Sequence, residues 1–186
     1  MDFDYKTYIT SEKLLSYYES MLTANKNSSQ SILNIFRQQL PSLSSYSFPN
    51  GTEVKLENKF KSFKHLINQI ESYVFGPEFK KSFSAMNHSQ AIDDQTQFPL
   101  RHLLFWAAML GDFKMVQVVY VHLAKYEGGG IIAALALATI FKQAARLSSA
   151  IQQSTIYRKE STYYEQIAVD ILTKTYQKAN DKMSVI

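Results

Sequence analysis

One stretch decides the fold, residues 98–125, which read FPLRHLLFWAAMLGDFKMVQVVYVHLAK. Its apolar residues recur every three or four positions on both sides of a single glycine, a spacing typical of two amphipathic helices. Gly111 breaks the first helix, and the carboxylate of Asp112 can cap the second. Because Ala107 and Ala108 are small, two antiparallel helices can approach each other closely here. The stretch therefore predicts a helix-turn-helix unit.

The residues before this unit also have helical spacing. A helix is predicted over residues 11–24, and a second, short helix follows and ends at Pro41. A third predicted helix carries the most regular apolar stripe of the chain, from Leu56 to Val74, and Gly76 ends it. Residues 77–98 are mostly polar and have no sustained period, so they predict a long loop, and the next helix is predicted to open at Pro99.

Two more helices are predicted after the unit. Gly128-Gly129-Gly130 indicates a turn, and residues 131–147 are apolar on nearly all sides, as expected of a helix that has neighbours all round it. The last helix is predicted to begin near Tyr157. Its apolar face comprises Tyr164, Ile167, Ala168, Ile171, Leu172 and Thr175.

These patterns predict an all-α fold of about seven helices, stacked as antiparallel pairs in an ankyrin-like α-solenoid. No alternating run bounded by hairpin turns indicates a strand. We read the chain as one domain with three parts: N-terminal helices over 1–76, the long polar loop over 77–98, and a four-helix ankyrin-like part over 99–186. Because no neighbouring 33-residue stretch repeats the pattern, a true ankyrin array is not predicted.

Composition excludes several classes of protein. The 186 residues include no Cys, which rules out a disulfide framework, a thiolate zinc site and a thiol nucleophile. The formal net charge of +4 is too small to indicate a nucleic-acid partner. The N-terminus has no apolar signal region. The longest uncharged apolar stretch, residues 128–141, is shorter than the roughly 20 residues of a membrane span. We therefore expect a soluble, cytoplasmic chain without a membrane span.

A search for catalytic motifs predicts no enzyme. The four histidines, His65, His88, His102 and His122, show no metal-binding spacing. There is no nucleophile elbow, no paired-carboxylate motif and no phosphate-binding loop, since the triple glycine is not followed by Lys-Ser/Thr. We expect no catalytic residue, no metal and no cofactor.

A basic patch lies on the third predicted helix. Lys59, Lys61 and Lys64 stand off its apolar stripe, in the segment from Lys55 to Lys81 that is rich in lysine. These lysines have two interpretations, which the sequence leaves open. They form a solvated helix face, or they form a docking face for an acidic partner or an anionic ligand.

Three blocks in the C-terminal half carry a family resemblance: LLFWAAM (103–109), AALALATIFKQAA (133–145) and YYEQIAVDILTKTYQKANDKM (163–183). In this order they resemble the cytosolic melastatin homology region of melastatin-type transient receptor potential cation channels. The resemblance is strong over 99–183 and looser before. The matching positions include a set that we expect to form the structural core: Trp106, Ala107, Ala133, Ala134, Tyr164, Ala168 and Tyr176.

The resemblance implies a function. A chain of this kind would be the cytosolic helical part of a calcium-permeable cation channel subunit, on the cytoplasmic side of a membrane. Its partners would be other subunits or domains of a tetrameric channel, and it would help to assemble subunits and to relay cytosolic signals to the pore, which is absent from this chain. The alternative is a free-standing α-helical repeat module for protein–protein interaction. A reading frame that continues past Ile186 into a hydrophobic stretch of about 20 residues would favour the channel.

Overall fold

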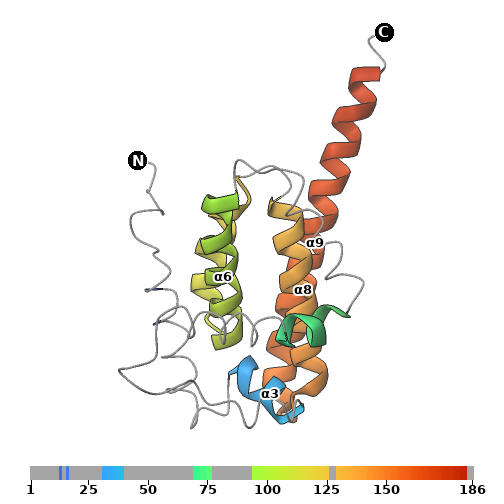
Figure 1. Ribbon diagram of the computed structural model, residues 1–186. Helices are drawn as coiled ribbons and strands as arrows, with labels where there is room; N and C mark the ends of the chain where they lie inside the picture. Colours follow the sequence, from blue (N-terminus) through green and yellow to red (C-terminus); the bar gives the residue numbers. More distant parts are fainter. Residues whose placement is uncertain are drawn as a thin grey trace. The chain divides into compact units, whose positions relative to one another are not determined.

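The computed structural model describes residues 13, 16, 31–39, 69–76, 94–125 and 129–183 (Figure 1). Within these ranges the chain forms helices and no strand, so the all-α prediction is confirmed. The count of seven helices and their stacking as antiparallel pairs stay predictions. The chain divides into two compact units, Met1–Val119 and Tyr120–Ile186, and the boundary lies within one helix, α7 (Phe113–Leu123). The predicted domain bounds are not tested by this division.

In the first unit, helix α3 (Ile32–Gln39) forms where the second helix was predicted. Ser31 caps it, because the backbone N–H of Asn34 donates a hydrogen bond to the Ser31 hydroxyl oxygen over 3.2 Å. Ile32, Leu33 and Phe36 are fully buried, as the apolar stripe requires.

The third predicted helix is described only at its end, over residues 69–76. Ile70 and Val74 are buried there. The ring of Tyr73 meets the ring of Phe36 edge-on, with centroids 5.9 Å apart, which joins this helix to α3. Gly76 has a φ of 73° at the predicted stop. Of the helix predicted over 11–24, Lys13 and Ser16 are described, and both are helical.

The turn between α6 (Asp94–Leu110) and α7 has the predicted chemistry. Gly111 adopts a φ of 76°, a backbone conformation that side chains disfavour. Its N–H donates to the carbonyl of Ala108 and the N–H of Asp112 donates to the carbonyl of Ala107, each over 3.0 Å. Asp112 Oδ1 then accepts the N–H of Met115 over 3.1 Å and caps α7.

The predicted start of α6 was wrong. The helix begins at Asp94, so residues 94–98 belong to it and not to the predicted loop, whose remaining residues lie outside the described ranges. Pro99 lies inside the helix. Proline fits best in the first turn, but one turn later it still costs only one backbone hydrogen bond close to the helix end.

In the second unit, α8 (Gly129–Leu147) packs along α9 (Ile151–Met183) (Figure 1). Both helices begin earlier than predicted, α8 by two residues and α9 by about six. Two hydrogen bonds fix their antiparallel register: the Ser154 hydroxyl donates to the carbonyl of Ala145 over 2.8 Å, and the Ser161 hydroxyl donates to the carbonyl of Ala138 over 2.9 Å. Residue numbers therefore fall along α8 as they rise along α9.

At the other end of the pair, Gly130 of α8 lies close to Ala124 and in contact with α9. A Cβ atom on Gly130 would lie 3.2 Å from the Cβ of Ala124 and 3.6 Å from the Cδ1 of Ile171. Position 130 therefore has little room for a side chain. It also shows that the end of α8 lies against Ile171, as the register predicts.

Among the described residues, one helical segment, Gly130–Leu147 of α8, is long and apolar enough to cross a membrane by length and composition alone. It extends beyond the predicted apolar stretch because the helix continues through Lys142. Half of the segment is buried inside the protein. The core helix of a soluble protein has the same properties, so this segment is weak evidence for a span.

Candidate interaction surface

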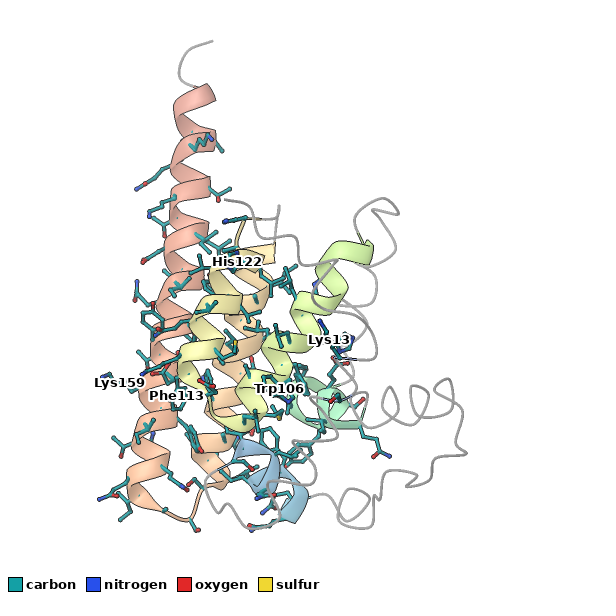
Figure 2. The ribbon with its side chains drawn as sticks, turned by 90° about the vertical axis from the view of Figure 1, so that its left-hand side faces the viewer. Lys13, Trp106, Phe113, His122 and Lys159 are labelled. Carbon is teal, nitrogen blue, oxygen red and sulfur yellow. The ribbon has the colours of Figure 1, made fainter. Side chains whose placement is uncertain are left out.

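The structure buries most of the residues expected in the core. They are Ala107, Ala133, Ala134, Tyr164 and Ala168. Trp106, on α6, is half-buried (Figure 2). Tyr176 contradicts the prediction, because 69% of its surface is exposed. Tyr176 fits the apolar period of α9, but α8 does not extend far enough to cover it.

Tyr164 is the centre of an aromatic cluster in the second unit, and it is fully buried. Its ring meets those of Tyr120 and Tyr163 edge-on, at centroid distances of 5.5 and 5.1 Å, and stacks on Phe141 at 6.0 Å. Pairs in these geometries add to the stabilisation that comes from burial alone. The cluster therefore holds the segment before α8, α8 and α9 together.

The hydroxyl group of Tyr164 has no hydrogen-bond partner. The neighbouring hydroxyl of Tyr120, in contrast, donates to the carbonyl of Gly130 over 3.2 Å. Burial raises the pKa of Tyr164 well above its ordinary value, and the charge of Glu160 and the phenols of Tyr163 and Tyr120 raise it further. Burial likewise raises the pKa of Glu160. The shift keeps the Tyr164 phenol in its neutral form, which suits a structural core better than proton transfer.

Replacing Tyr164 by phenylalanine should remove the cost of the unpaired hydroxyl, and we expect the free energy of unfolding at pH 7 to rise by about 1 kcal/mol. The variant should also resist alkali better. The folded state holds the phenol proton more tightly than the unfolded chain, so the parent loses stability as the pH rises above the ordinary pKa of 10.0. Urea unfolding at pH 7 and pH 10.5 measures both effects.

Tyr120→Phe is the matched control, since it removes a hydroxyl that has a partner. We expect it to lower the free energy of unfolding by about 0.5–1.5 kcal/mol. Some alkaline sensitivity should remain in both variants, because burial also raises the pKa of Tyr157. A Tyr164→Phe variant that is less stable than Tyr120→Phe would contradict the unpaired hydroxyl.

The free end of α9, residues 172–183, is the surface that sequence reasoning missed. Since Ile171 lies against the first turn of α8, the residues after it have no partner in α8. Figure 1 shows α9 continuing past the end of α8. At 1.5 Å per residue the free end is about 18 Å long. Every side chain described on it, from Leu172 to Asn180, is exposed.

The free end of α9 has two different faces. Val169, just before the free end, and Leu172 are 52% and 55% exposed, and with the more exposed Tyr176 they lie three and four residues apart, on one side of the helix. Lys174 and Lys178, four residues apart, lie on the other side and are exposed too. Exposed apolar residues arranged in a stripe are typical of a surface that binds another protein.

The other predicted site residues are not brought to this surface. The candidate docking lysines, Lys59, Lys61 and Lys64, lie outside the described residues. His102 and His122 lie on different helices, α6 and α7. Within the described ranges, no group of three or more His, Asp or Glu side chains could hold a metal ion.

Comparison with known proteins gives the family. No curated protein and no solved structure matches the chain. A family model described as a TRPM2-like domain matches residues 3–185. This match covers nearly the whole chain and agrees with the melastatin-type resemblance of its sequence, so the protein belongs to the family of TRPM2-like domains.

Proposed function

We propose that this chain is the cytosolic helical part of a calcium-permeable, melastatin-type cation channel subunit, and that it helps to assemble subunits and to couple cytosolic signals to the pore. The observation that carries the proposal is the family match over residues 3–185. The chain would lie on the cytoplasmic side of the membrane, next to other subunits or domains of a tetramer. It would contribute binding surfaces to the channel, but neither the pore nor a catalytic activity.

Two features of the second unit support a role in binding. Its interior is a packed aromatic core around Tyr164, with the buried Tyr120 and Phe141, which gives a rigid body. Its long helix α9 extends from that body and exposes the apolar residues Leu172 and Tyr176. A rigid body with an exposed helix is suited to contacts between subunits.

The reading frame of the transcript tests the proposal. Mapping both ends of the messenger RNA in the source cells should show coding sequence that continues past Ile186 into hydrophobic segments of about 20 residues each, as a channel requires. A transcript that stops at Ile186, with no such segment, would overturn the channel role. It would favour the alternative, a free-standing helical module that binds other proteins.

The lysines of the predicted basic helix give a second test. Replacing Lys59, Lys61 and Lys64 together by glutamine should weaken binding to the remaining cytosolic part of the channel subunit, because an acidic docking partner would lose three opposite charges. The free energy of unfolding should change by no more than about 0.5 kcal/mol per site. Binding is measured by calorimetry at low and high salt, and the parent should bind less tightly at high salt.

The triple replacement of Lys114, Lys125 and Lys159 by glutamine is the control, since it removes the same charge at exposed positions outside the basic helix and the free end of α9. It should leave this binding unchanged. If the two triple variants bind equally well, and added salt has no effect, the lysines at 59, 61 and 64 are a solvated face.

A further inference from the structure

We propose that the free end of α9 is a self-docking surface, which pairs with the free end of α9 in a second copy of this chain. The proposal deepens the assembly role and rests on it for its setting in a channel. The contact would be made by α9 alone, so it would remain in a free-standing module.

No residue of α8 lies beside the free end of α9. The hydroxyls of Ser154 and Ser161 donate to the α8 carbonyls of Ala145 and Ala138. Seven residues forward along α9 therefore correspond to seven residues back along α8. Continuing this register brings Ala168 opposite Ile131, near the start of α8 at Gly129. Helix α9 then runs on for three more turns, through Met183, with its described side chains exposed.

The apolar positions of the free end have the spacing of a helix that pairs with another helix. They follow a seven-residue repeat in which the first and fourth positions are apolar: Val169, Leu172, Tyr176, Ala179 and, at the next position, Met183. Before residue 169 the repeat is absent, since the corresponding positions hold Thr162 and Glu165. This is the repeat by which two helices pair along a common seam. The repeat begins opposite the first residues of α8, beyond which no α8 residue accompanies α9.

The charges beside the seam favour a second copy of this chain as the partner. The positions that border the seam are Thr173, Thr175 and Asn180, which carry no charge, and then Lys182. Two copies can therefore approach with little repulsion, while Lys174 and Lys178 stay in water on the far side. Charged residues beside the seam would be needed to select a helix of different sequence, and this seam has almost none.

A membrane surface is a poorer occupant. A helix that lies on lipid has a broad apolar face with large aromatic or Leu residues, and lysines close enough to reach the headgroups. The seam here is narrow and includes Ala179, and Lys174 and Lys178 lie on the opposite side of the helix. Residues 169–183 span about 22 Å, or two repeats. A seam of this length gives weak pairing, because stable coiled coils usually need three or four repeats.

Cysteine cross-linking tests the pairing, because the chain has no natural cysteine. In the variant Tyr176→Cys the new thiols face each other across the seam of a parallel pair, and mild oxidation should give a disulfide-linked dimer. The control Lys174→Cys places an equally accessible thiol on the far side, and we expect it to link at least tenfold more slowly. Adding Leu172→Asp to Tyr176→Cys should reduce the linking rate to that of the control.

Sedimentation of the unmodified full chain gives a second readout. The average mass should rise with concentration, and the rise should be lost in Leu172→Asp but kept in Gln177→Glu, which adds a negative charge away from the seam. Equal linking rates for the two cysteine variants would overturn the proposal. So would a chain that stays monomeric and binds phosphatidylserine vesicles through Leu172. Neither result would affect the transcript test of the channel role.

Discussion

Replacing Tyr164 by alanine should lower the free energy of unfolding by about 3–5 kcal/mol, the largest loss that we expect from one substitution in this chain. The side chain is fully buried and touches the rings of Tyr120, Phe141 and Tyr163. Truncation removes these contacts and leaves a cavity that the helices cannot fill. The unpaired hydroxyl, which is lost as well, places the result toward the lower end of the range.

Denaturant unfolding followed by circular dichroism measures this loss, and Tyr163→Ala is the control. Tyr163 is the neighbour of Tyr164 on the same helix, and half of its surface is exposed. The same truncation there should cost about 1 kcal/mol, because less apolar surface is returned to water. Equal losses at the two positions would mean that the aromatic cluster is not the centre of the second unit.

Ala134→Leu should lower the free energy of unfolding by about 1–3 kcal/mol, for the opposite reason. Ala134 lies on α8 and is fully buried, so three extra carbon atoms must displace their neighbours. Ala150→Leu makes the same change at an exposed position just before α9 and should stay within about 0.5 kcal/mol of the parent. Thermal melting compares the two variants. If Ala134→Leu melts with the parent, the site has room for a larger side chain and α8 is not packed as described.

Local sequence predicted the turns well. Gly111 and Asp112 act through hydrogen bonds to residues three to five positions away, so the information needed is contained in a few neighbouring residues. Helix starts were predicted less well: α6 begins before Pro99, and α9 begins before Tyr157. A proline near a helix start and a polar first turn are both compatible with helix or loop, and packing decides between them.

The candidate surface could be predicted only in part. The apolar periodicity of α9 is continuous from Tyr164 to Tyr176. It does not show that the first turn of α8 lies opposite Ile171 and that α8 does not cover the residues after it. The prediction therefore placed Tyr176 in the core, whereas the structure exposes it. A signal for the register was present in the small residues Ser154, Ser161 and Ala168, which recur every seven positions on α9. Ala138 and Ala145 have the same spacing on α8 and lie opposite the two serines.

The length of α9 has a mechanical consequence. Its first two-thirds are held against α8 by the hydrogen bonds of Ser154 and Ser161, while the last 18 Å or so extends beyond α8. A tilt of the held part by about 10° would carry the tip sideways by about 3 Å, since a helix of this length bends little over three turns. A small repacking around the buried rings would thus be converted into a larger displacement at Met183.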